Sequence, residues 1–235
     1  MDCKISFSEQ DLIGGNGNWN VYQVVIDDIP RIIKKCGSLD GKKVDSNIQN
    51  FKLVKNIGLP TLSFLEKYHY KNEFIIIGEH LNCNEDKIYV SPNSISILNP
   101  NSYSNMTGLE QLLKSENEIR WKHTGTAEKF RNTHKLHSIL NFEKFIYKIK
   151  TDIKKATSNF IYIYFDSYFW GSDKQNTISE LSYKIADFDN IEKCENTKFS
   201  ELYNANIEEM KISMRSFLQY FVDENKSHQY IEKLK

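Results

Sequence analysis

The chain has 235 residues, of which 40% are hydrophobic, so it can bury the core of one large domain or of two small lobes around a cleft. Lysine and arginine together number 31, as do aspartate and glutamate, and the net charge of zero argues against nucleic acid as a partner. No apolar run approaches the roughly 20 residues of a membrane helix, and the first residues lack a signal-peptide pattern, so we expect a cytoplasmic protein with no membrane span.

The N-terminal region is predicted to form a strand from about residue 4 that leads into the glycine- and asparagine-rich stretch IGGNGNWNVYQV (13–24). Glycine and asparagine tolerate the positive φ of a tight hairpin, and their small side chains let backbone N–H groups approach phosphate oxygens. The stretch is therefore either a phosphate-binding loop or an ordinary hairpin turn. A second strand, VYQVVI, and a third, RIIKKC (31–36), are predicted to follow it.

A short helix is predicted next, because IQNFKLVKNI (48–57) has apolar residues near helical spacing and ends at Gly58, before Pro60. Two strand-like runs follow, TLSFLEKYHY (61–70) and NEFIIIGEHL (72–81), and a hairpin turn joins them. The FIII segment of the second run is apolar on both faces, which is typical of a central strand.

The second half of the chain is predicted to hold more helix, with a long aromatic strand in the middle. Helices are expected at GLEQLLKSENEI (108–119), at 141–157 and at about 199–222. Strands are expected at KIYV, SISIL, FIYIYFDSYFW (160–170) and LSYKIADFDNI (181–191), with a polar loop between the last two.

This order of elements predicts an α+β protein of two lobes. We expect a β-rich, nucleotide-binding N-terminal lobe with its hinge over residues 1–81 and a mainly helical C-terminal lobe over residues 82–235. A cleft between two lobes is the natural place for a ligand.

The order also resembles the protein-kinase-like superfamily. The stretch GGNGNWNVYQV resembles its glycine-rich loop, and the GG…N form is similar to that of aminoglycoside and choline kinases. The resemblance implies that Gly14, Gly15, Gly17 and Asn20 bind the cofactor ATP. Asn20 stands where the pattern's third glycine is expected.

RIIKKC resembles the strand that carries the family's phosphate-binding lysine, which implies that role for Lys34. Lys35 is the alternative, because a slip of one residue turns a strand's side chains to the other face. The helix resembles the one whose glutamate holds that lysine, but Asn50 occupies the matching position and Asp45 is the nearest upstream acid. FIIIGEHLN resembles the strand that runs into the hinge, so Glu79 and Leu81 are implied to contact adenine.

YKIADFDNI resembles the strand end that carries Asp-Phe-Gly in the family, with Asp189 in place of glycine. The resemblance implies that Asp187 binds Mg²⁺; the alternative is an Asx turn that closes the strand. Asp166, which precedes Asp187 by 21 residues, resembles the catalytic aspartate that takes the acceptor hydroxyl's proton. No His-Arg precedes it, and Gly171 replaces the family's metal-binding asparagine.

In the loop that follows, Asn176 is predicted to replace the family's metal-binding asparagine as the second metal ligand, and Asp173 is an acidic alternative.

The resemblance thus implies an ATP- and Mg²⁺-dependent phosphotransferase. Only 48 residues follow Asp187, so the chain is similar to the compact kinases that some bacterial pathogens deliver into host cells, which implies a Ser/Thr hydroxyl of a protein as acceptor. Three alternatives stay open: a pseudokinase that serves as a binding module, a small-molecule kinase, and an α+β interaction protein without nucleotide.

Overall fold

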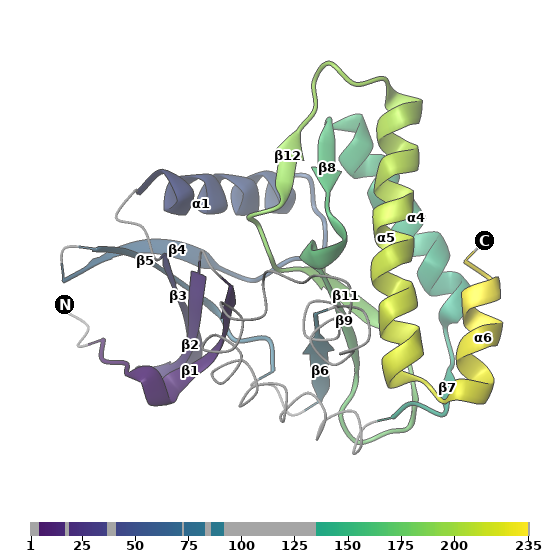
Figure 1. The fold of residues 1–235 in the computed structure, drawn as a ribbon, viewed down its shortest axis with the longest axis horizontal. Helices are drawn as coiled ribbons and strands as arrows, with labels where there is room; N and C mark the ends of the chain where they lie inside the picture. Colours follow the sequence, from purple (N-terminus) through teal and green to yellow (C-terminus); the bar gives the residue numbers. More distant parts are fainter. Residues whose placement is uncertain are drawn as a thin grey trace, which may run out of the picture.

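The computed structural model describes residues 5–16, 19–36, 41–71, 73–82, 86–91 and 135–234. A five-stranded antiparallel sheet and the helix α1 lie at one end of the molecule, and three helices, α4 to α6, lie at the other (Figure 1). This architecture confirms the predicted α+β class. The predicted division of the chain between residues 81 and 82 stays a prediction.

The five-stranded sheet has the order β1-β2-β3-β5-β4. Its strands are β1 (Leu12–Asn16), β2 (Trp19–Ile26), β3 (Ile29–Cys36), β4 (Leu65–Tyr70) and β5 (Glu73–Glu79). The central position predicted for the FIII run is confirmed, because β5 lies between β3 and β4 and Ile75 and Ile76 are fully buried. The short 3-10 helix η1 (Glu9–Asp11) precedes β1.

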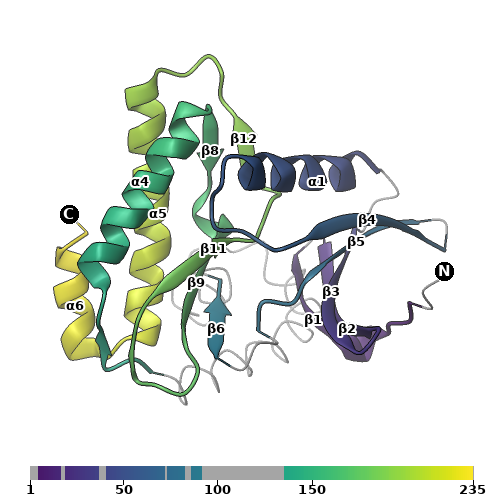
Figure 2. The same cartoon turned by 180° about the vertical axis from the view of Figure 1, so that it is seen from behind.

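Helix α1 (Gly41–Asn56) joins β3 to β4 and lies along one face of the sheet, as both views show (Figures 1 and 2). It begins seven residues before the predicted start, and its buried side chains are Val44, Asn47, Phe51 and Val54. The opposite face of the sheet has its own apolar cluster, over which Phe7 packs against Tyr22 and Tyr70.

The second half of the chain combines short strands with long helices. Its helices among the described residues are α4 (Phe142–Ser158), α5 (Phe199–Phe221) and α6 (Glu224–Glu232). Its strands are β6 (Lys87–Val90), β7 (Ser138–Ile139), β8 (Ile161–Ile163), β9 (Tyr168–Asp173), β10 (Ile178–Ser179), β11 (Ser182–Ile185) and β12 (Ile191–Lys193). Strand β9 pairs with β6 and β11, β8 pairs with β12, and β7 pairs with β10.

The single strand predicted over residues 160–170 is wrong. The 3-10 helix η3 (Phe165–Ser167) interrupts it, because the Ser167 N–H donates to the Tyr164 carbonyl at 3.1 Å and turns the chain. The predicted helix at 141–157 is confirmed in α4, and that at 199–222 is confirmed in α5. The predicted elements SISIL and GLEQLLKSENEI lie outside the described residues, whereas KIYV is strand β6.

One continuous core joins the two ends of the molecule. It runs from α1 through the D-F-D segment, which we define as residues 187–189, to the facing sides of α4 and α5. The loop between α1 and β4 is bonded to β11, since the Ile185 N–H donates to the Pro60 carbonyl at 2.8 Å and the Thr61 hydroxyl donates to the Ile185 carbonyl at 2.7 Å. These bonds fix β11 relative to α1.

Helix α5 is bonded to the residues around η3 through two polar side chains. Asn206 is fully buried; its Oδ1 accepts from the Ile163 N–H at 2.8 Å and its Nδ2 donates to the Ile161 carbonyl at 2.9 Å. Glu209 accepts from the Phe165 N–H at 2.9 Å. The turn that carries Asp166 is therefore positioned by α5.

We expect Asn206→Leu to lower the free energy of unfolding by about 3 kcal/mol, because two buried backbone groups of β8 lose their partners. Asn204→Leu on the exposed side of the same helix is the matched control and should change stability by less than about 0.5 kcal/mol. Urea unfolding monitored by circular dichroism measures both. Equal effects of the two substitutions would contradict the role given to Asn206.

Candidate functional site

The register of β3 decides which of the two adjacent lysines faces the interior. Lys34 lies opposite Val21 and Ile76 and is buried on the α1 side of the sheet. Lys35 points to the other face, where its Nζ lies 2.8 Å from a carboxylate oxygen of Glu73. Of the two lysines, Lys34 is therefore the one that reaches the residues predicted to form the site.

Lys34 forms an ion pair with Asp187. The Lys34 Nζ lies 3.2 Å from Asp187 Oδ1, although 153 residues separate them in the sequence. Burial alone would lower the pKa of the Lys34 amine, but the negative charges of Asp187 and Asp189, with a smaller contribution from Asp166, outweigh burial and raise the pKa. The neighbouring carboxylates thus favour the charged form of Lys34.

Asp166 is joined to these residues by Asn190, which directly follows the D-F-D segment. The Asn190 Nδ2 donates to Asp166 Oδ2 at 2.8 Å, and the Tyr164 N–H donates to the Asn190 carbonyl at 3.3 Å. The 3-10 helix η3 is thereby bonded to the chain that leaves β11. The structure brings together Lys34, Asp166 and Asp187, as the sequence predicted.

Helix α1 reaches the D-F-D segment with two amides. The Asn50 Nδ2 donates to the carbonyls of Phe188 and Ile191, at 2.9 Å each, and the Asn47 Nδ2 donates to a carboxylate oxygen of Asp189. The Phe188 ring is fully buried and meets the Phe51 ring edge to face, with centroids 5.4 Å apart.

Sequence reasoning singled out Asn50 but missed Asn47 and Asn190. Asn47 had a usable signal, because Asn47, Phe51 and Val54 follow the i, i+4, i+7 spacing of a buried helix face. An asparagine in such a stripe points to a buried polar contact. Asp45, the acid considered upstream, instead pairs with Lys67 at 2.7 Å on the surface.

The glycine-rich stretch forms the β1–β2 hairpin. Gly14 and Gly15 lie in β1 and pair with Val21 and Asn20, whereas Gly17 lies outside the described residues. Asn20 is exposed and lies opposite Lys35, because side chains alternate along a strand. Its side chain therefore points away from Lys34, and a cofactor on the Lys34 side can meet only its backbone.

Trp19, the first residue of β2, places its ring beside Lys34. It is 3% exposed, and the Lys34 Nζ lies 5.1 Å from the centroid of its ring. An aromatic face beside a buried ammonium supplies a favourable cation–π contact. The lysine is therefore held between Trp19 and Asp187.

At the predicted hinge, the Glu79 side chain forms hydrogen bonds with other residues of the chain. Its carboxylate accepts from the Lys184 Nζ at 2.8 Å and from the Ser63 N–H at 2.5 Å, and its own N–H donates to the Phe64 carbonyl. Burial alone would raise the pKa of Glu79, but these hydrogen bonds and the charge of Lys184 lower it. Leu81 lies in the turn after β5, and its N–H has no hydrogen bond within the described residues.

Asn176 and Asp173 are not brought to the site. Strand β9 leads away from Asp166, Asp173 ends the strand, and Asn176 lies in the exposed turn beyond it. Gly171 packs under a ring of β6, since a Cβ there would lie 2.5 Å from Tyr89 Cε1. Gly171, Asp173 and Asn176 therefore cannot supply the second metal ligand. The sequence had predicted Asn176 for that role.

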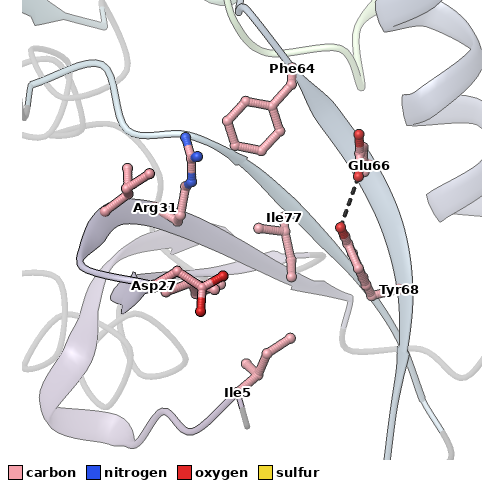
Figure 3. A pocket seen from close by; sticks show the side chains of 9 residues that line it. Ile5, Asp27, Arg31, Phe64, Glu66, Tyr68 and Ile77 are labelled. Carbon is pink, nitrogen blue, oxygen red and sulfur yellow. Dashed lines mark hydrogen bonds between the residues drawn. The ribbon is translucent and has the colours of Figure 1, made fainter. Parts of the chain in front are cut away.

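Two of the cavities among the described residues bear on the choice of site, and both lie away from this group. One, of about 320 Å³, opens on the outer face of the five-stranded sheet, where the Arg31 guanidinium lies 4.2 Å from the centroid of the Phe64 ring (Figure 3). The other, of about 660 Å³, lies between α4 and β11 and includes Phe145 and Tyr183. Neither is lined by Lys34, Asp166 or Asp187.

No group of three or more His, Cys, Asp or Glu side chains is arranged to hold a metal ion by itself in the part of the chain that the structure describes. Across the same residues, none of the helices is long and apolar enough to span a membrane.

Comparison of the sequence with protein-family models and with curated proteins finds no match. A solved structure described as WaaP in complex with acyl carrier protein is similar to this chain, with a TM-score of 0.42 and 8% sequence identity. The similarity covers 95% of this chain and 77% of that chain. Because the TM-score and the identity are both low, the likeness carries no functional conclusion.

We expect Glu79→Gln to lower the free energy of unfolding by about 1 kcal/mol at pH 7, because the charged bond to Lys184 is lost. The lowered pKa of Glu79 contributes stability above its ordinary value of 4.5, and this contribution disappears as the pH falls through the lower, folded-state value. Urea unfolding at pH 7 and at several acidic values should therefore show the two proteins converging in acid. The exposed Glu66→Gln is the control, and a difference that stays constant with pH would contradict the pairing.

Proposed function

We propose that the chain is an ATP-dependent phosphotransferase of the protein-kinase-like fold, with its nucleotide between the five-stranded sheet and the D-F-D segment. The single observation that carries the proposal is the contact of buried Lys34 with Asp187, beside Asp166. The order β1-β2-β3-α1-β4-β5 and the antiparallel sheet support a two-lobed arrangement of this kind.

The group fits ATP and Mg²⁺ by its donor chemistry. Lys34 offers a fixed positive charge for phosphate oxygens, and Asp187 offers a carboxylate to a hard cation. Mg²⁺ is commonly held by one or two carboxylates together with substrate phosphates and water, so the Asp187 carboxylate suits it as a ligand. When bound, Mg·ATP supplies a γ-phosphoryl group whose charge the metal partly neutralises.

The roles of the chain's own residues follow from their positions. Lys34 binds and orients the phosphates, and Asp187 holds the metal in the same place. Asp166, held by the Asn190 amide, takes the proton of the acceptor hydroxyl at its carboxylate. The carbonyl of Glu79 and the N–H of Leu81 face adenine, and the backbone of Gly14 and Gly15 covers the phosphates. Catalysis is then mostly positioning and charge neutralisation.

We further propose a Ser/Thr hydroxyl of a protein as the acceptor, on the resemblance to compact effector kinases. The alternative function is a pseudokinase, and one observation favours it. Neither Gly171 nor Asn176 places an amide near Asp187, so the second metal ligand expected of an active kinase is not supplied by that loop.

ATP with Mg²⁺ should stabilise the protein against thermal unfolding, by about 2.7 kcal/mol at 100 times the dissociation constant. Lys34→Met should remove this stabilisation, whereas Lys35→Met on the outer face is the matched control and should retain it. Differential scanning fluorimetry measures the shift with and without Mg²⁺. Equal losses in the two variants, or no shift in the wild-type protein, would contradict a nucleotide site at Lys34.

Asp166→Asn should lower phosphate transfer by about 10²- to 10⁴-fold and leave Mg·ATP binding intact, because the proton acceptor is lost while the metal ligand stays. Asp187→Asn should weaken Mg·ATP binding itself. Labelled γ-phosphate transfer to casein as a generic acceptor, followed by phosphoamino-acid analysis, measures the first effect and the acceptor class. Binding without transfer in the wild-type protein would favour the pseudokinase, and transfer that survives Asp187→Asn would refute the metal assignment.

A further inference from the structure

Helix α1 offers no negative charge to Lys34. Asp45 is the only acidic residue in α1, and its carboxylate is bonded to the Lys67 amine on the surface. The charge of Lys34 is balanced from the D-F-D segment instead, chiefly by Asp187. What α1 presents to that segment is the uncharged pair Asn47 and Asn50.

Asn50 spans the whole turn that follows β11. Its single Nδ2 donates at 2.9 Å to the carbonyl of Phe188 and at 2.9 Å to that of Ile191, two residues beyond the D-F-D segment. The two carbonyls flank Asp189 and Asn190, and Asn190 in turn holds Asp166. One side chain of α1 therefore fixes the backbone on both sides of residues that contact the proposed catalytic groups.

The environment of Asn47 is separate evidence that an asparagine is needed there for the site and not for the stability of the fold. It is 1% exposed, and its Nδ2 donates to Asp189, but its Oδ1 is buried without a hydrogen-bond partner in the described part of the chain. A buried amide oxygen without a partner costs free energy, and such groups in native structures commonly belong to functional regions. An apolar residue would avoid the cost but could not bind Asp189.

We propose that Asn50 and Asn47 are positioning residues that hold the D-F-D segment so that Asp187 stays beside Lys34. This inference rests on the proposed function. Two amides on α1 then hold the helix in position at the site, in place of an ion pair between a helix carboxylate and the strand lysine. Because amides do not titrate and need no countercharge, the arrangement is assembled before the nucleotide binds, and Lys34 remains available to the phosphates once they compete for it.

The packing of Phe188 supports the same arrangement. Its ring is fully buried against Phe51, one residue after Asn50 on α1. Moving α1 away would therefore expose the Phe188 ring and break both Asn50 hydrogen bonds at once. A helix held by three such contacts is fixed in its place over the site.

The test compares Asn50→Asp with Gln49→Glu. Both substitutions turn an amide into a carboxylate at neighbouring positions of α1, but Gln49 is exposed. Asn50→Asp removes the N–H donor and places an oxygen against two carbonyl oxygens. Hydrogen exchange of the backbone amides, read over residues 187–193 in nucleotide-free protein, reports the position of the segment directly. Calorimetric titration with ATP, in Mg²⁺ or in EDTA, reports its consequence for the site.

We expect Asn50→Asp to accelerate exchange over residues 187–193 by about tenfold, with β5 and α5 unchanged, because two hydrogen bonds are lost locally. The dissociation constant for ATP should rise by about tenfold in Mg²⁺ and by less than about twofold in EDTA, since Asp187 acts through the metal. Gln49→Glu should change neither quantity.

Unchanged exchange in Asn50→Asp would overturn the proposal. So would acceleration throughout the chain, or equal weakening of ATP binding in Mg²⁺ and EDTA, because each indicates a residue that only supports the fold. If the wild-type protein binds no ATP while exchange over residues 187–193 still accelerates, the proposed function fails and the link between Asn50 and the D-F-D segment stands.

Discussion

The ion pair of buried Lys34 with half-buried Asp187 is the interaction on which the arrangement of the site depends. A lysine removed from water is costly unless a carboxylate lies beside it, and here strand β3 supplies the cation while the chain leaving β11 supplies the anion. The rest of the structure fixes these two segments relative to each other. Hydrogen bonds of Pro60 and Thr61 join β11 to the loop after α1, and the amide of Asn50 holds the turn beyond it.

Much of the fold could be predicted from periodicity, and the failures have physical causes. The apolar FIII run correctly indicated the central strand β5, and amphipathic spacing correctly indicated α4 and α5. The first turns of α1 were missed because their buried face includes Asn47, which does not count as apolar in such a pattern. Helix α6 was missed because Ser227 is its only buried residue. The break at Asp166 was hidden within a run of strand-forming aromatic residues.

Site residues could be predicted from the sequence where their order along the chain matches a known pattern. They could not where their position depends on strand register or on contacts between distant segments. Lys34, Asp166 and Asp187 were named from the sequence and lie together, although their chemical roles stay predictions. Strand register, which one sequence does not fix, turned Asn20 to the outer face. Asn190 was missed because its contact with Asp166 joins two segments that are distant in the sequence and that the pairing of β8 with β12 brings together.

The proposed function requires Lys34 and Asp187 to form a Mg·nucleotide site. The decisive experiment is a crystal structure of the chain with Mg²⁺ and a non-hydrolysable ATP analogue. We expect phosphate oxygens in contact with the Lys34 amine and a metal ion about 2.1 Å from the Asp187 carboxylate. Nucleotide bound elsewhere, or a Lys34–Asp187 pair unchanged with neither group touching the ligand, would contradict it.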